Sequence, residues 1–174
     1  MRSASLILGL SVACLASTSL WAESVPPQLR NKSITASWTM QRSVMTPRGE
    51  RQSPSISVSR LIYVSGNGRF FVKATINTHS AEVAPGEKTP HGGARDMMFS
   101  GGKIVGTAQR GAGAGRMMIS FDQTYSSCSV HVMYGKPPGQ RVMITNRRGV
   151  RVELLGVTYS GQSCSIRDGN AFSN

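Results

Sequence analysis

The sequence predicts an all-β protein, an antiparallel meander of about eight to ten strands that forms a barrel or a two-sheet sandwich. Three observations lead to this prediction. Apolar and polar residues alternate with a period of two in most segments, and turn residues such as Gly, Pro and Asn separate those segments. No window of about eleven or more residues combines a helical period with helix caps. Periodicity alone does not separate a barrel from a sandwich.

The first 22 residues have the pattern of a secretory signal peptide. Arg2 precedes an apolar run from Leu6 to Ala16, and small residues lead to a cleavage site at Ala22. The run is about 11 residues long, well short of the roughly 20 that a bilayer span needs. Cys14 lies in this leader, but Ser11, three positions earlier, is not the large aliphatic residue typical of a lipoprotein signal. We therefore expect a periplasmic or secreted protein whose residues 23–174 form a single β-rich domain.

The first strands are expected in the N-terminal half of that domain. Ser33 to Gln41 alternates strictly, whereas Met45 to Pro54 contains two prolines and predicts a loop. Ser55 to Ser65 and Arg69 to Asn77 flank the tight-turn sequence of residues 66–68, so they predict a hairpin.

The C-terminal half predicts further hairpins around two glycine-rich or proline-rich connections. Thr78 to Ala94 lacks apolar periodicity and predicts a long surface loop, and Gly111 to Gly115 predicts a flexible connection. Strands are expected at residues 97–99, 103–109, 116–122, 128–134, 141–146, 150–160 and 163–167.

Two cysteines, Cys128 and Cys164, remain once the leader is removed, and a disulfide is the expected state in an oxidising compartment. Both follow a Tyr-Ser sequence, at residues 125–126 and 159–160, so two similar strand edges lying side by side would bring the cysteines together. In the chain-entropy model this bridge contributes roughly 4 kcal/mol to stability. The Cys-x-x-Cys spacing of redox-active pairs is absent, so we expect a structural bridge.

The domain is strongly basic. Without the leader it has nineteen Lys and Arg against eight Asp and Glu, a net charge of +11, and fourteen of the basic residues are arginines spread from Arg30 to Arg167. Such a field favours polyanions such as lipopolysaccharide, acidic polysaccharide, nucleic acid or an anionic membrane surface. The same charge also promotes solubility.

The densest basic stretch surrounds one predicted turn near the C-terminus. Arg141, Arg147, Arg148 and Arg151 could form an anion-binding patch on the two adjacent strands. The alternative is a solvated edge that discourages strand-to-strand aggregation.

No catalytic constellation is evident. The eight acids are scattered, no Gly-x-Ser-x-Gly motif occurs, and His79 and His91, with Glu82 and Glu87 between them, match no compact metal site. His131 is expected to be an exposed strand residue. We therefore predict no catalytic residues, no metal and no cofactor.

Aromatic residues beside a basic residue are the one pattern that could suggest nucleic-acid binding. Tyr63, Phe70 and Phe71 flank Arg69, but one of the two phenylalanines must face inward, and core packing explains most of the group. A secreted protein also rarely meets nucleic acid, so this partner is not expected.

Several short motifs together resemble those of a group of small secreted, functionally uncharacterised proteins of rhizobial-type alphaproteobacteria. They are residues 31–38 (NKSITASW), residues 63–69 (YVSGNGR), residues 120–122 (SFD) before Cys128, and residues 163–165 (SCS) near Gly169-Asn170. The resemblance runs over most of the mature chain. It implies an envelope or secreted location and transfers no functional residues.

We therefore expect a secreted or periplasmic non-enzymatic β-domain that interacts with anionic envelope material through an arginine-rich surface. Anionic polysaccharide, lipopolysaccharide and a membrane surface are the partners considered, and the sequence gives no oligomeric state. Two alternatives are a β-barrel carrier of a small apolar ligand, suggested by the many methionines, and a hydrolytic enzyme of unrecognised type.

Overall fold

The computed structural model describes residues 23–76, 79–81, 97–108, 115–135, 139–145 and 149–172. The predicted leader at residues 1–22 lies outside them. The strands are β1 (Lys32–Thr46), β2 (Gly49–Gln52), β3 (Ile56–Val64), β4 (Phe70–Ile76), β5 (His79–Ala81), β6 (Met97–Ser100), β7 (Lys103–Thr107), β8 (Gly115–Phe121), β9 (Cys128–Tyr134), β10 (Val142–Thr145) and β11 (Arg151–Asp168). A single 3-10 turn, η1 (Pro27–Leu29), is the one helical element in the described ranges. The predicted all-β class is confirmed.

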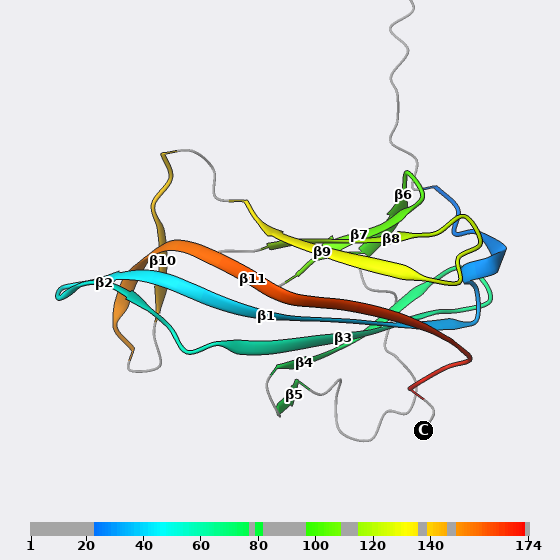
Figure 1. The fold of residues 1–174 in the computed structure, drawn as a ribbon, viewed down its shortest axis with the longest axis horizontal. Helices are drawn as coiled ribbons and strands as arrows, with labels where there is room; N and C mark the ends of the chain where they lie inside the picture. The colour runs from blue at the N-terminus through cyan, green and yellow to red at the C-terminus, as the bar shows by residue number, and fades with distance from the viewer. Residues whose placement is uncertain are drawn as a thin grey trace, which may run out of the picture.

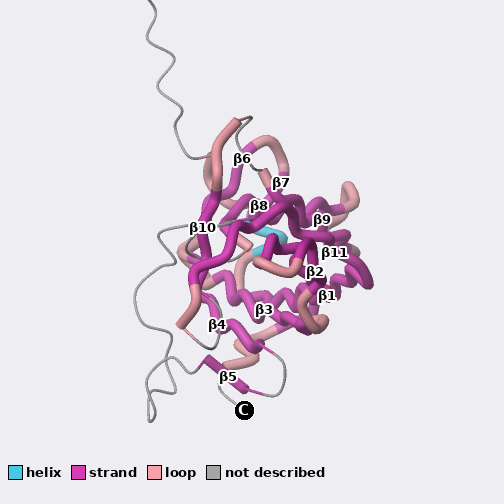
Figure 2. Tube along the Cα trace, turned by 90° about the vertical axis from the view of Figure 1, so that its left-hand side faces the viewer, coloured by secondary structure: helices cyan, strands magenta, loops and turns pink. Residues whose placement is uncertain are grey.

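The strands form two antiparallel sheets. A seven-stranded sheet has the order β10-β11-β1-β3-β4-β5, with β2 paired to β1, and a four-stranded sheet has the order β6-β7-β8-β9. The four-stranded sheet lies over the half of the larger one that is away from β2 and β10, and the two together have the curl of a half-barrel (Figure 1, Figure 2). Within the described residues no ladder joins the sheets, so the arrangement is two layered sheets and not a closed barrel.

The pairing of β11 with β1 joins the two ends of the domain. It runs from Lys32 opposite Asp168 to Met45 opposite Glu153. The segments expected as separate strands at residues 150–160 and 163–167 are therefore one continuous strand. Consecutive strands pair as hairpins within β3-β4-β5, β6-β7-β8-β9 and β10-β11, whereas β1 pairs with β3 as well as with β2 and the chain changes sheet after β5 and after β9.

Two β-bulges let this long strand keep its apolar side toward the core. Residues paired inward with β1 are Leu154, then Val157 and Tyr159, then Cys164 and Ile166. The inward-facing residues therefore change from even to odd numbers and back to even numbers. The two changes fall at the two register shifts in the β1–β11 ladder. Gly161, at one of these shifts, has φ of 58°, a conformation that costs glycine little.

Two segments expected as loops contain strands. Within Met45 to Pro54, β1 continues to Thr46 and turns back into β2 through Gly49, whose φ is 97°. The Thr46 hydroxyl donates to the Gly49 carbonyl at 2.8 Å and closes this turn. Within Thr78 to Ala94, β5 pairs with β4. Local backbone pairing outweighs the low apolar content of both segments.

The core lies between the two sheets and receives side chains from both. The strict alternation of β1 places Ile34, Ala36, Trp38 and Met40 on the buried face, as the sequence predicts. The opposing layer contributes Phe99, Ile104, Met117, Ile119, Val130 and Val132.

Arg60 is buried in this core, with 8% of its surface exposed. It lies between Ala36 and Ala74 on the neighbouring strands, and these small side chains leave room for the arginine. Its guanidinium donates to the carbonyl oxygen of Ala108 at 2.8 Å, immediately after β7, and so links the two sheets from inside. This hydrogen bond offsets part of the cost of burying the guanidinium.

Candidate polyanion-binding surface

The Cys128–Cys164 disulfide is present, as predicted, and joins the start of β9 to β11 with a Cα–Cα distance of 5.6 Å. β9 is the edge strand of the smaller sheet. Two residues along the chain from Cys164, the Gln162 side-chain oxygen accepts a hydrogen bond from the Val132 backbone N–H at 3.1 Å. The bridge and this hydrogen bond together close one side of the half-barrel and partly satisfy the open edge of β9.

Only part of the predicted arginine patch can be placed. Arg147 and Arg148 lie outside the described residues, so the clustering of all four arginines stays a prediction. Arg151 pairs with Thr145 at the turn end of the β10–β11 hairpin, whereas Arg141 precedes β10 at the opposite end. Both are exposed.

An acid lies between these two arginines. Arg141 Nε is 3.8 Å from Glu153 Oε2, and the side chain of Arg141 is 83% exposed. An exposed pair of this kind contributes little to stability. It does reduce the positive charge at one end of the hairpin, so Arg151 is the more available anion contact of the two.

The outer face of the larger sheet bears a continuous row of hydroxyl and amide side chains. The outward positions of β1 and β11 are paired one to one: Thr35 with Ser165, Ser37 with Ser163, Thr39 with Ser160, and Gln41 with Thr158. We call these eight residues the polar stripe. All are exposed or half-buried, and the Ser37 and Ser163 hydroxyls are 2.7 Å apart. From Thr35 to Gln41 the stripe is about 20 Å long at the usual rise of a strand.

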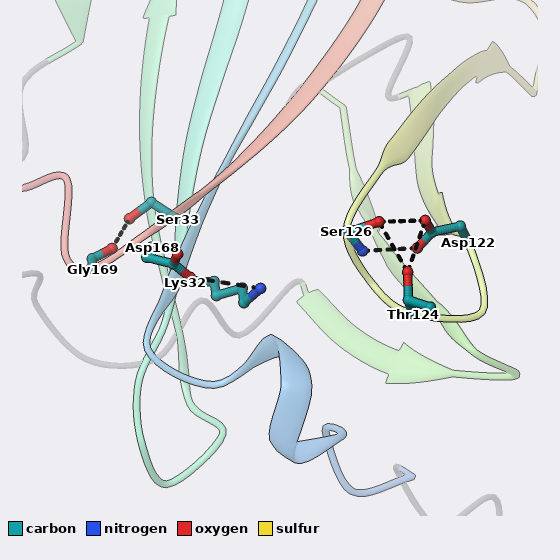
Figure 3. Close-up of polar contacts among 7 residues, drawn as sticks. All are labelled: Lys32, Ser33, Asp122, Thr124, Ser126, Asp168 and Gly169. Atoms are coloured by element: carbon teal, nitrogen blue, oxygen red, sulfur yellow. Dashed lines mark hydrogen bonds and ion pairs between the residues drawn. The ribbon is translucent and has the colours of Figure 1, made fainter.

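The C-terminal turn lies beyond one end of this stripe, where Gly169 contacts Ser33 (Figure 3). The Ser33 hydroxyl donates to the Gly169 carbonyl at 2.7 Å and accepts a hydrogen bond from the Ala171 N–H at 2.9 Å. Beside it, Lys32 Nζ is 3.6 Å from the Asp168 carboxylate. These contacts hold the end of β11 against β1.

An aromatic and basic cluster lies next to the same end, on β3 and β4. Phe70 is buried, so Phe71 faces outward, as alternation requires. Phe71 is paired with Tyr63, and their ring centroids are 6.2 Å apart with an interplanar angle of 26°. Arg69 and Lys73 flank Phe71 two positions away on either side, on the same face. We call Tyr63, Arg69, Phe71 and Lys73 the aromatic-basic cluster.

The sequence grouped three of these residues but missed Lys73. Counting every second residue along residues 69–73 would have placed Arg69, Phe71 and Lys73 on one face. What periodicity could not show is which neighbouring strand carries Tyr63 beside Phe71. That follows only from the register of β3 with β4.

The outer face of the smaller sheet is more apolar. Two rows of paired residues cross this face from strand to strand. One row is Met98, Val105, Met118 and His131, in the order β6 to β9, and the other is Thr107, Arg116 and Met133, in the order β7 to β9. An open hollow of about 420 Å³ lies over part of this face. His131 is exposed on β9, as expected.

The β8–β9 loop is built around one carboxylate (Figure 3). Asp122 accepts hydrogen bonds from the Ser126 hydroxyl at 2.6 Å, the Ser126 N–H at 2.8 Å and the Thr124 hydroxyl at 3.1 Å. These donors, the Ser126 hydroxyl first among them, hold the pKa of Asp122 far below the ordinary aspartate value. The loop leads directly into Cys128, so the carboxylate orders the approach to the disulfide.

Two tyrosines, Tyr134 at the end of β9 and Tyr159 within β11, have buried hydroxyls. The hydroxyl oxygens of Tyr134 and Tyr159 have no hydrogen-bond partner within the described ranges. Burial raises the pKa of both phenols, and for Tyr159 the nearby Arg42 partly opposes that rise. The Tyr159 hydroxyl lies against Gly115, where an added Cβ would be only 2.4 Å from it.

The described part of the chain contains no cluster of three or more His, Cys, Asp or Glu side chains able to bind a metal ion. His91, Glu82 and Glu87 lie outside it, and only the backbone of His79 is described, in β5.

Comparison with protein-family models, curated proteins and solved structures finds no match to this chain. Among the residues that the structure describes, no helix has the length and apolar character needed to cross a membrane.

Proposed function

We propose that this protein is a non-enzymatic β-domain of the periplasm or cell exterior that interacts with anionic envelope material through its arginine-rich surface. The observation that carries the proposal is the net charge of +11 on residues 23–174, part of it on exposed arginines and lysines of a disulfide-braced scaffold. Such a charge raises the local concentration of anionic polymers and speeds their association.

The basic side chains are available for this role. Several are exposed and form no ion pair with the described residues: Arg48, Arg51, Arg69, Lys103, Arg116, Arg151 and Arg167. Arginine suits polyanions because its planar guanidinium can bind a carboxylate or phosphate through two parallel hydrogen bonds.

The proposed compartment is supported by the disulfide, which persists in oxidising environments and is rare in the cytosol. The leader pattern at residues 1–22 and the resemblance to secreted rhizobial proteins point to the same compartment.

The proposal is tested by applying residues 23–174 to immobilised heparin and immobilised lipopolysaccharide under a salt gradient. Because each neutralised anion releases counterions, a polyanion-binding protein should elute at distinctly higher salt than a neutral protein of similar size. Elution of both proteins at the same low salt would refute the proposal.

A matched pair of variants locates the contact. Arg141→Gln/Arg151→Gln removes two charges from the predicted patch, and Arg48→Gln/Arg51→Gln removes two from the β1–β2 hairpin nearby. The first variant should elute earlier than the second. Equal shifts would mean that the β10–β11 hairpin has no special part in binding.

A further inference from the structure

We propose that the outer face of the seven-stranded sheet binds an extended acidic polysaccharide, with one sugar ring at the aromatic-basic cluster and the following rings along the polar stripe. This inference rests on the proposed function, names a ligand class for it and adds a second contact surface to the arginine patch. It combines three features that the charge count alone does not contain: a stacked aromatic pair, flanking cations and a long row of neutral hydroxyls.

The aromatic pair supplies a surface for a sugar ring. Phe71 is half-buried and its ring stacks against that of Tyr63, so the two rings restrain each other's orientation. The Tyr63 hydroxyl donates to the side-chain oxygen of Asn31 at 3.3 Å, which fixes the outer end of that ring. Asn31 in turn packs against Gly66, where a Cβ would meet its Oδ1 at 3.2 Å. Rigid aromatic side chains bind with little loss of conformational entropy.

The flanking cations favour a ligand with negative charge. Arg69, the residue before β4, and Lys73 within it lie two positions on either side of Phe71, and Arg167 lies at the end of the polar stripe on β11. None of the described carboxylates lies on β3 or β4. A sugar ring that carries a carboxylate or a sulfate would therefore find a positive partner beside the ring surface.

The polar stripe favours a sugar polymer over a nucleic acid. Its eight side chains are uncharged, and seven of them are hydroxyls that can both donate and accept hydrogen bonds, which matches the hydroxyl groups of a polysaccharide. A single-stranded nucleic acid would instead need cations following its backbone and further aromatic residues for successive bases.

The test uses the mature chain and three probes: polygalacturonate, the same polymer with its carboxylates methyl-esterified, and oligo(dT) of similar charge. Affinity electrophoresis or calorimetry at one fixed salt concentration gives the dissociation constants. We expect polygalacturonate to bind more tightly than either of the other probes.

Two matched pairs of variants locate the site. Arg69→Gln/Lys73→Gln removes one Arg and one Lys from the cluster, and Lys103→Gln/Arg116→Gln removes the same charges from the outer face of the smaller sheet. The first should weaken polygalacturonate binding by about tenfold, and the second by no more than about twofold. Unfolding midpoints confirm that both variants are folded.

The second pair adds a negative charge. Ser165→Glu introduces it into the polar stripe and should repel the polymer, whereas Ser129→Glu introduces it on β9 and should not. Phe71→Leu keeps an apolar side chain but removes the ring, and should also weaken binding.

Three results are decisive. If both members of each pair weaken binding equally, the polymer responds to total charge, so this inference fails while the proposed function stands. If oligo(dT) binds more tightly than polygalacturonate and responds to the cluster variants, the face is a nucleic-acid site and the inference is again wrong. If the wild-type protein binds neither polygalacturonate nor heparin nor lipopolysaccharide, the proposed function itself fails.

Discussion

The contact between Gly115 and the Tyr159 hydroxyl leads to a quantitative prediction. A Cβ at position 115 would lie 2.4 Å from this oxygen, whereas ordinary contacts begin at 3.4 Å. The tyrosine ring, or β8, would have to shift by about 1 Å, and overpacking of this kind costs about 1–3 kcal/mol. Gly115 has no positive φ, so replacing it in a strand would otherwise gain about 0.5–1 kcal/mol. Gly115→Ala should therefore lower the free energy of unfolding by up to about 2.5 kcal/mol, with a central value of about 1 kcal/mol.

Removing the hydroxyl should reverse most of this cost. Tyr159→Phe deletes a buried hydroxyl without a described partner, so by itself it should be neutral or slightly stabilising. In that background the remaining neighbours of the new Cβ, the ring carbon of residue 159 and the Met133 carbonyl, are both at 3.2 Å and require only a small adjustment. Gly115→Ala should then change stability by less than about 0.5 kcal/mol.

Urea unfolding of the four proteins in this double-mutant cycle, with the disulfide intact, measures the coupling. Gly156→Ala is the control, because a Cβ there meets nothing within 4 Å, and it should cause no loss of stability. If Gly115→Ala is equally costly with Tyr and with Phe at position 159, the hydroxyl contact does not determine the packing and the reasoning is refuted.

Three further predictions concern the closure of the half-barrel. Cys128→Ala/Cys164→Ala should lower the free energy of unfolding by about 4 kcal/mol, and a loss below about 1 kcal/mol in urea unfolding would contradict the brace. Gln162→Ala leaves the Val132 N–H without its acceptor and should cost about 1 kcal/mol, while Gln162→Glu keeps an acceptor and should cost less; equal losses would argue against this hydrogen bond. Because the pKa of Asp122 is depressed in the folded state, its contribution is complete above the unfolded value of about 4 and is lost as the pH falls below it. Asp122→Asn should therefore reduce the difference in stability between pH 7 and pH 3, and an unchanged difference would show that another group dominates.

Local alternation was sufficient to predict the faces of the regular strands. In β1 the inward set of Ile34, Ala36, Trp38 and Met40 follows directly from the period of two. The same rule requires one of Phe70 and Phe71 to face inward, and the structure shows that it is Phe70. The leader pattern and the cysteine count predicted the disulfide, because only two thiols remain to pair.

The rule cannot follow β11. The two bulges in this strand change the inward parity between Leu154 and Val157 and again between Tyr159 and Cys164. A bulge adds one residue against a partner strand, so its position depends on the partner's register and not on the strand's own sequence. For the same reason the sequence showed two short strands where the structure has one.

The sequence by itself determined the fold class, the bridge, the basic charge and which residues of each regular strand face outward, because these depend on composition and on neighbours two positions away. Only the tertiary structure decided that β11 pairs with β1, that Arg60 sits between two alanines inside the core, and that Tyr63 stacks on Phe71 beside a stripe of hydroxyls. Those arrangements depend on contacts between residues far apart in the chain, and they assemble the face on which the proposed ligand lies.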